Sequence, residues 1–194
     1  IRMDPIDEKI DALAGKGVFF FGGPILDGIS YNLFLNISHL QKTQPDRVVW
    51  LIMKSPGGLV DEGFAVYDLI RAFIKKGVRI NIICMGVIAS MGVSILQAAS
   101  RRYSFPNTQF MIHEVSQEIE VANEKASESD ERTVEIKRVN QIVMEHLAER
   151  TGLGLKEIMA QVHKTDVWLD ARGAMNFGPQ GLIDEIVDTF PFEF

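Results

Sequence analysis

The chain has 194 residues, of which 46% are hydrophobic and 24% charged, and its formal net charge is −6. These values are ordinary for a globular domain and exclude wholesale disorder, while the acidic balance argues against nucleic acid as the main partner. No apolar run approaches the roughly 20 residues that span a bilayer, and the first residues lack the pattern of a signal peptide. The single cysteine, Cys84, cannot form an internal disulfide. We therefore expect a cytoplasmic protein with no membrane partner, metal site or cofactor.

Strand-like and helix-like stretches alternate from the start of the chain to His113. Short apolar runs predict strands at 18–21, 48–53, 78–85 and 109–112. Apolar spacing and composition predict helices over 27–43, 61–76 and 89–100, the first of them capped by Asp27. Strands that alternate with helices in this way predict a parallel sheet and an α/β fold.

After His113 the character of the sequence changes. Residues 114–135 are polar and acidic, an amphipathic helix is predicted from 136 to about 152, and a short strand is predicted at 167–169. Asp170 is expected to cap a helix over 171–177. We find no repeat and no low-complexity linker, so we expect one domain over 1–194. Its head is about 18–112 and 151–190, and a helical arm protrudes over about 114–150.

Ser90 is the candidate nucleophile. It follows a predicted buried strand and opens a helix of small residues, so its hydroxyl can lie at the carboxyl end of the sheet. The backbone N–H of Met91 points into the same space, where a helix N-terminus favours developing negative charge. Taken alone, a serine at this position more often caps or packs its helix.

A nucleophilic serine needs a base, and the chain has four histidines. His113 ends the strand that follows the Ser90 helix, and a helix that returns the chain to the next parallel strand brings the two residues together. His39 and His146 lie within predicted helices and are interpreted as packing residues. His163, close to Asp166, is a weaker rival for the base.

The base needs an orienting carboxylate. Asp166 and Asp170 flank the short strand at 167–169, and Asp170 already has a capping role, so Asp166 is preferred; Asp184 is a third choice. The turn Ser55-Pro56-Gly57-Gly58 follows another buried strand, and its glycines allow a backbone N–H to approach an oxyanion. Each feature has an ordinary structural explanation by itself, but together they supply every part of acyl-transfer chemistry.

From about Val18 to Val187 the chain resembles the ClpP family, the proteolytic subunit of the caseinolytic (Clp) protease. The matching segments, in order, are Ser55-Pro56-Gly57-Gly58, Gly63-Phe64-Ala65-Val66-Tyr67-Asp68, Cys84-Met85-Gly86, Ala89-Ser90-Met91-Gly92, Pro106-Asn107, Met111-Ile112-His113 and Gly181-Leu182-Ile183-Asp184. The Ala-Ser-Met-Gly and Met-Ile-His elements in this order are specific to the family.

The resemblance implies a serine endopeptidase with Ser90 as nucleophile, His113 as base and Asp166 as orienting acid. It implies backbone N–H groups of Gly58 and Met91 as oxyanion donors. The implied fold is the spiral of βαβ units shared with crotonases, with a protruding handle. The implied assembly is a homo-oligomer of heptameric rings, stacked as a tetradecamer around the active sites. An AAA+ ATPase unfoldase normally supplies peptide or unfolded protein substrates.

The chain departs from the family pattern after His113, just before Asp166, and before Val18, where the family's axial-loop sequence is not recognisable. His113 is followed by Glu114-Val115 where the family commonly has Gln-Pro, and the usual glycine-rich stretch is replaced by residues 116–120. Lys164 and Thr165 stand where an acidic–arginine pair often helps to link the rings. Peptide hydrolysis is therefore better supported than ring stacking or unfoldase docking.

Three other functions stay open. The altered residues after His113 are compatible with a non-proteolytic ring subunit that keeps the fold. A crotonase-type acyl-CoA enzyme would share the spiral fold and glycine oxyanion donors without needing a Ser-His-Asp set. A Ser-Lys peptidase with Lys125 as base ranks lowest, because His113 already lies where a triad requires it.

The acidic charge is concentrated in the arm. Residues 114–135 hold eight acids and two bases, which equals the whole net charge of −6. By resemblance this arm lies where two rings meet. A solvated acidic helix face is the plain explanation; the sharper hypothesis is that opposed arms repel, which makes ring stacking depend on salt and pH, with Lys164 offsetting part of the repulsion.

Overall fold

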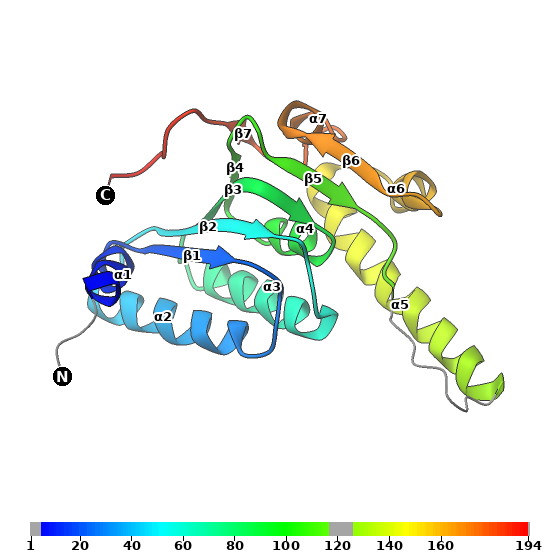
Figure 1. Ribbon diagram of the computed structural model, residues 1–194, viewed down its shortest axis with the longest axis horizontal. Coiled ribbons are helices and arrows are strands. Elements are labelled where there is room, and N and C mark those ends of the chain that lie inside the picture. The colour runs from blue at the N-terminus through cyan, green and yellow to red at the C-terminus, as the bar shows by residue number, and fades with distance from the viewer. Residues whose placement is uncertain (1–4, 117–125, 194) are drawn as a thin grey trace.

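The computed structural model describes residues 5–116 and 126–193 and shows an α/β fold with a mixed sheet of seven strands (Figure 1). The strands are β1 (Val18–Gly22), β2 (Val49–Ser55), β3 (Ile80–Ala89), β4 (Arg101–Ser104), β5 (Gln109–Ile112), β6 (Val167–Asp170) and β7 (Glu185–Ile186). The helices are α1 (Pro5–Gly15), α2 (Ile29–Thr43), α3 (Val60–Lys75), α4 (Met91–Leu96), α5 (Ala126–Thr151), α6 (Leu155–Val162) and α7 (Ala171–Met175). The prediction of an α/β fold is confirmed.

The long strand β3 divides the sheet into two branches. Its first half pairs with β4, and its second half pairs with β5, so that Ala89 lies opposite Met111. The main path runs β1-β2-β3-β4-β7 and is parallel throughout, whereas β6 pairs with β5 in the antiparallel direction. The predicted parallel sheet is confirmed for the strands up to β5, and β6 adds an antiparallel strand, because the chain comes back through α5 and α6 to the same end of β5 that it left at Ile112.

Both faces of the sheet are covered, by different parts of the chain. Leu51 and Met53 pack with α2 and α3 in the main core, whereas Trp50 and Ile52 face the other side. There the C-terminal tail crosses the sheet (Figure 1), and the ring of Phe192 lies 5.0 Å from that of Trp50. Because alternate residues of a strand point to opposite faces, this double cover explains why β2 is a continuous apolar run.

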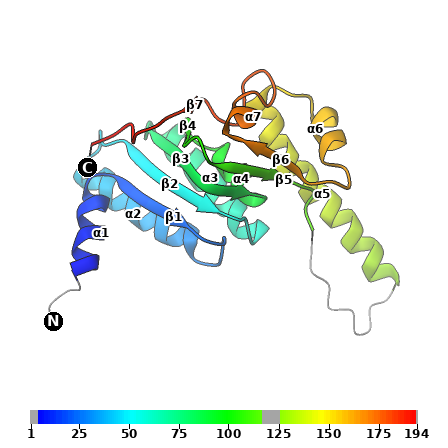
Figure 2. The same cartoon turned by 45° about the horizontal axis from the view of Figure 1, so that its top comes forward.

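Figure 2 shows α5 extending beyond the sheet as an arm. Its C-terminal half is anchored: Val143, Met144 and Leu147 are buried in the main core. The helix begins at Ala126, earlier than the expected start at 136, because the acidic residues before 136 continue the same helix. Part of the predicted acidic segment, residues 117–125, lies outside the described residues.

Other sequence predictions need correction. Asp27 does not cap α2, because Gly28 occupies the N-cap position in the left-handed conformation with φ of 90°. The predicted helix over 89–100 shortens to α4, since β3 continues to Ala89 and the chain re-enters the sheet as β4. The sequence patterns do not predict α1, β4, α6 or β7. Asp170, in contrast, caps α7 as expected, accepting a hydrogen bond from the N–H of Gly173 at 2.7 Å.

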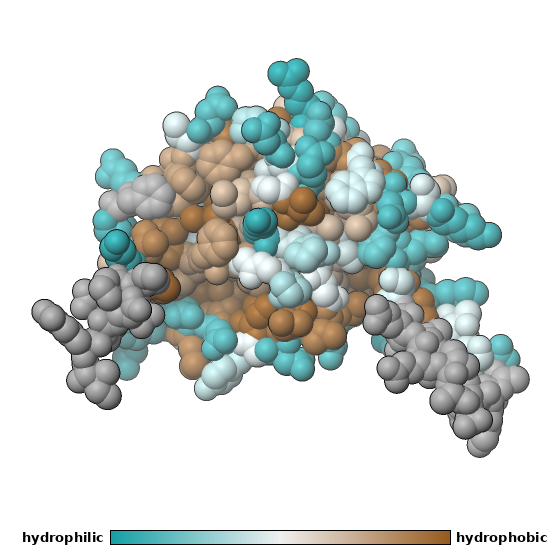
Figure 3. All heavy atoms as spheres, in the orientation of Figure 1, coloured by the Kyte–Doolittle hydropathy of each residue, from teal (hydrophilic) through white to brown (hydrophobic). Residues whose placement is uncertain are grey.

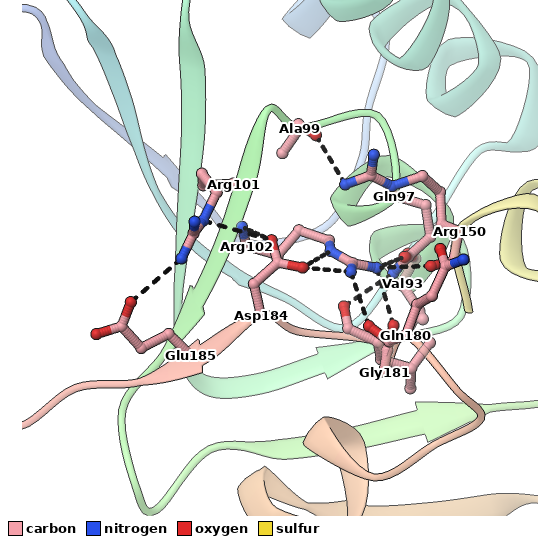
Figure 4. Close-up of polar contacts among 11 residues, drawn as sticks. Val93, Gln97, Ala99, Arg101, Arg102, Arg150, Gln180, Gly181, Asp184 and Glu185 are labelled. Atoms are coloured by element: carbon pink, nitrogen blue, oxygen red, sulfur yellow. Dashed lines mark hydrogen bonds and ion pairs between the residues drawn. The ribbon is translucent and has the colours of Figure 1, made fainter. Parts of the chain in front are cut away.

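Arg102 ties the C-terminal part of the chain to the sheet (Figure 4). Its guanidinium is almost fully buried and donates to the Asp184 carboxylate, the Gln97 side chain and the carbonyl oxygens of Gln180 and Gly181. Burial acts to raise the pKa of Asp184, but the hydrogen bonds and charge of Arg102 outweigh it and lower that pKa. Asp184 is thus committed to a structural pair on β4 and β7.

Candidate active site

Ser90 sits at a strained turn between β3 and α4. Its φ of 54° and ψ of −126° are rarely adopted by a residue with a side chain. The turn is held by a hydrogen bond from the Ser90 N–H to the Met111 carbonyl oxygen at 2.9 Å. It is also packed tightly, because a Cβ placed on Gly57 would lie 2.7 Å from the Ser90 Cβ. This geometry presents the serine hydroxyl at the carboxyl edge of the sheet.

His113 reaches Ser90 from the neighbouring strand. Because Ala89 of β3 pairs with Met111 of β5, the residues that follow each strand emerge at the same edge of the sheet. The Nε2 atom of His113 lies 2.7 Å from the Ser90 Oγ, which is hydrogen-bonding distance. The distance matches that required between a nucleophile and its general base.

Asp166 and His113 lie at the same end of the β5–β6 ladder, and no hydrogen bond joins their side chains in the described part of the chain. In the β5–β6 ladder Ile112 pairs with Val167, so the next residues on the two strands, His113 and Asp166, face each other across the end of the ladder. The Asp166 side chain is exposed and makes no hydrogen bond within the described part of the chain. The structure therefore brings Ser90 and His113 together, and it leaves Asp166 adjacent and unengaged.

Gly58 and Met91, whose backbone N–H groups are candidate oxyanion donors, line the same cleft as Ser90. Gly57 and Gly58 have φ of 97° and 150°, and the Ile25 backbone holds this turn through hydrogen bonds to the Gly57 carbonyl oxygen and from the Leu59 N–H. Neither the Gly58 N–H nor the Met91 N–H has an acceptor among residues 5–116 and 126–193. Such unpaired donors beside a nucleophile are suited to binding an oxyanion.

The site opens into a small cleft of about 110 Å³. Its walls are Gly58, Val60, Ser90, Met91, His113, Val115, Ser116 and Val143. The three valines make one side apolar, and Val143 comes from the anchored half of α5. The arm therefore contributes directly to the surface that a bound side chain would touch.

The segment after His113 is fixed by contacts that the sequence did not reveal. The Val115 N–H donates to the Asn140 side chain of α5 at 2.9 Å. The Glu114 carboxylate accepts from the Lys164 N–H at 3.1 Å and lies 3.4 Å from the His163 Nδ1. In the sequence Glu114 stands out only because it departs from the family pattern after His113. No other feature of the sequence points to its contacts with His163 and Lys164.

The remaining histidines have other environments. His39 is exposed on α2. His146 stacks on Tyr67 at a centroid distance of 3.7 Å, and its Nδ1 lies 2.8 Å from the Ser94 Oγ. Burial lowers the pKa of His146. Since Ser94 is fully buried, this second serine–histidine pair joins α4 to α5 and does not form a nucleophilic site.

Three further observations concern possible metal ligands, membrane spans and the cysteine among the described residues. Across 5–116 and 126–193 there is no group of three or more His, Cys, Asp or Glu side chains arranged to hold a metal ion. In the same ranges no helix combines the length and the apolarity that a membrane span requires. Cys84 is buried, and burial raises the pKa of its thiol, so it is not an alternative nucleophile.

The sequence was also compared with known protein families. It matches a family model described as Clp protease over residues 4–190, which is nearly the whole chain. The matched region includes the strained turn at Ser90, the neighbouring His113, both glycines of the opposite turn and Asp166.

Proposed function

Since the chain belongs to the Clp protease family, a family of peptidases, we propose that it is a serine endopeptidase that cleaves peptides or unfolded proteins through an acyl-enzyme. The observation that carries the proposal is the 2.7 Å contact between the Ser90 Oγ and the His113 Nε2. The contact occurs at a strained turn, in a cleft that also contains two backbone N–H groups without an acceptor among the described residues.

In the proposed reaction Ser90 attacks the peptide carbonyl while the Nε2 of His113 takes the hydroxyl proton. The N–H groups of Gly58 and Met91 bind the oxyanion of the tetrahedral intermediate. His113 then gives the proton to the leaving amine, and the ester of Ser90 remains. Water, activated by the same histidine, attacks this ester and releases the carboxylate product.

Asp166 is proposed to orient the His113 ring. A carboxylate at the Nδ1–H fixes the tautomer in which Nε2 can accept a proton, and it stabilises the imidazolium that forms. Asp166 is supported by its place opposite His113 in the β5–β6 ladder and by the capping role that occupies Asp170. Engagement requires the exposed Asp166 side chain to rotate towards the ring while the main chain keeps its place at the start of β6.

Assembly is proposed from the family and from the surface. Members of the Clp protease family generally form oligomeric rings and work with ATPases, and we propose heptameric rings, stacked in pairs, with an AAA+ unfoldase, in the cytoplasm. Apolar side chains gather on the surface over β1 and α2 (Figure 3). The exposed members there include Phe20, Leu26, Tyr31, Phe34 and Leu35. Burial between subunits would remove this apolar area from water.

We propose one peptidase domain over 1–194, with the head at about 18–112 and 151–190 and the arm at about 114–150. The arm supplies Val143 to the cleft and Asn140 to the segment after His113. These contacts support treating the arm as part of the peptidase domain and not as a separate unit.

A non-proteolytic ring subunit is the second candidate function, and the unengaged Asp166 favours it. The test is the Ser90→Ala variant with a fluorophosphonate probe and intact-mass measurement. We expect wild-type protein to gain one probe mass per chain and Ser90→Ala to gain none, with peptide cleavage lower by a factor on the order of 10⁴ or more.

Ser129→Ala is the matched control, because Ser129 is an exposed serine of α5 outside the cleft. It is expected to label and to cleave like wild type. Absence of labelling in wild-type protein would support the non-proteolytic candidate. Wild-type cleavage by Ser90→Ala would contradict the assignment of the nucleophile.

A further inference from the structure

Glu114 is the residue next to His113, and its carboxylate bridges to the turn that precedes β6. One oxygen accepts from the Lys164 N–H at 3.1 Å, and the other lies 3.4 Å from the Nδ1 of His163. The two partners come from the same turn, about 50 residues away along the chain. Glu114 thus joins the strand end that carries His113 to the segment that carries Asp166.

Lys164 has an unfavourable backbone conformation, which the contact with Glu114 stabilises. Its φ is 58°, and Ser90 is the only other non-glycine residue of the described chain with positive φ. A residue with a Cβ pays an energetic cost in this left-handed region unless local contacts compensate. The Glu114 carboxylate is such a contact, since it receives the N–H that this conformation turns towards it.

The electrostatics agree with the geometry. The hydrogen bond from the Lys164 backbone is the main cause that lowers the pKa of Glu114, and the His163 contact adds to it. Glu114 is consequently ionised near neutral pH, and a charged acceptor holds a backbone donor more strongly than a neutral one. The Lys164 side chain is exposed, and its charge also lowers the pKa of Glu114, but the hydrogen bond to the carboxylate comes from the main chain of Lys164.

The turn at 163–165 determines where Asp166 lies. The ladder places Asp166 opposite His113 only while the residues just before β6 continue the path of that strand. Release of Lys164 from the left-handed conformation would redirect the chain immediately before Asp166. We propose that Glu114 is a positioning residue that holds this turn, so that the main chain of Asp166 keeps its place at the start of β6, from which a side-chain rotation brings the carboxylate to the His113 ring. The inference rests on the proposed peptidase function.

The test compares three variants with wild type. Glu114→Ala removes the acceptor, Glu114→Gln keeps a neutral acceptor of the same length, and Glu114→Ala/Lys164→Gly removes the acceptor but supplies a residue that adopts positive φ without strain. Glu131→Ala is the control, because it removes an acid from the same arm at an exposed position with no described contact to the turn.

The readouts are kcat and KM for a chromogenic peptide, and the rate of fluorophosphonate labelling at Ser90. We expect Glu114→Ala to lose about tenfold or more in kcat and in labelling rate, with KM within about twofold of wild type. Glu114→Gln is expected to retain most of the rate, and Lys164→Gly is expected to restore most of it to Glu114→Ala. Native mass and circular dichroism establish that each variant folds and assembles.

The outcomes separate this inference from the proposed function. If wild-type protein neither labels nor cleaves, the peptidase assignment fails and the variants are not needed. If wild-type protein is active and Glu114→Ala keeps its kcat, the positioning role is overturned and the peptidase assignment stands. Equal losses in Glu114→Ala and Glu114→Gln, or no recovery with Lys164→Gly, would likewise overturn it.

Discussion

Ser90 and Gly57 show how single residues shape the turn between β3 and α4. The backbone at Ser90 is strained, and the strain is tolerated because the Met111 carbonyl oxygen and the close-packed Gly57 hold the turn from two sides. Strain of this kind costs about 1–3 kcal/mol and persists only where the surroundings enforce it. Packing around the turn therefore holds the Ser90 hydroxyl in place. The Ser90 side chain itself makes no capping hydrogen bond to α4.

The role of Gly57 can be tested by Gly57→Ala. The new methyl group would lie 2.7 Å from the Ser90 Cβ, at a residue whose φ is 97°. We expect the free energy of unfolding to fall by about 2 kcal/mol more than in the control described below, and Ser90 labelling to slow by about tenfold or more. Thermal or urea unfolding and fluorophosphonate labelling measure the two effects.

Gly23→Ala is the matched control, because Gly23 has φ of 92° and no atom lies within 4 Å of a Cβ built there. The Gly23→Ala substitution therefore has the energetic cost of an alanine at positive φ, but its methyl group makes no close contact of the kind that Gly57→Ala makes with Ser90. Equal effects of the two substitutions on stability and labelling would show that the close approach of Gly57 is unimportant.

At the scale of elements, α5 is docked on α3 and α4 through His146. The imidazole stacks on Tyr67 of α3 and pairs with Ser94 of α4, so one side chain of α5 contacts both helices. The charged groups that influence its titration are Asp68, Arg71, Glu145 and Glu149. Burial outweighs their effect and lowers the pKa of His146 below that of a free histidine.

The lowered pKa predicts a pH dependence of stability. An unfolded chain protonates this histidine below about pH 6.5, whereas the folded chain resists protonation. Stability is therefore maintained above about pH 6.5 and falls as the pH decreases below it. Urea unfolding at about pH 8 and about pH 5.5 should show a smaller loss of stability in His146→Gln than in wild type.

The exposed His39 supplies the control for this measurement, since His39→Gln removes a histidine without changing the α3–α5 contact. Its stability should follow the wild-type pH profile. Glu114 and Asp184 do not interfere, because their lowered pKa values place their effects at more acidic pH. Parallel pH profiles for wild type and His146→Gln would show that His146 is not the group responsible.

At the scale of the whole molecule, the charge of the arm determines whether the arms of two stacked rings would repel each other. The segment 114–135 carries the full net charge of −6, and Figure 2 shows that α5 projects from the head. Charges of one sign that approach within a Debye length, about 10 Å at 0.1 M salt, repel each other unless salt screens them. Stacking through these arms would then be weak at low ionic strength.

Analytical ultracentrifugation from low to high salt tests this expectation. We expect the largest assembly to increase in amount with ionic strength, and we expect the increase to be smaller in a variant with Asp130→Asn and Glu131→Gln. Both side chains are exposed on α5, so these changes leave the core intact. The same assembly size at every salt concentration would exclude repulsion between arms as a determinant of stacking.

Several features of this protein follow from sequence alone. Alternating apolar runs and amphipathic stretches are local signals, and they identified the α/β class, the positions of β1, β2, β3 and β5, and the capping role of Asp170. The candidate residues Ser90 and His113 were also identifiable, because each directly follows a strand and the chain returns to the sheet between them. Short elements such as β4 and β7 were missed, since a few residues carry no periodicity of their own.

Only the tertiary structure decided which of these residues meet and how they are held. The antiparallel pairing of β6, the contact of Glu114 with the Lys164 backbone and the packing of Asn140 near His113 join residues that are distant in sequence. Such contacts depend on the path of the chain between the elements, and composition and periodicity do not encode that path residue by residue. The sequence determined which chemical groups the site contains. The fold decided that Ser90 contacts His113, and that Asp166 directly precedes β6 at the same end of the β5–β6 ladder without a hydrogen bond to His113.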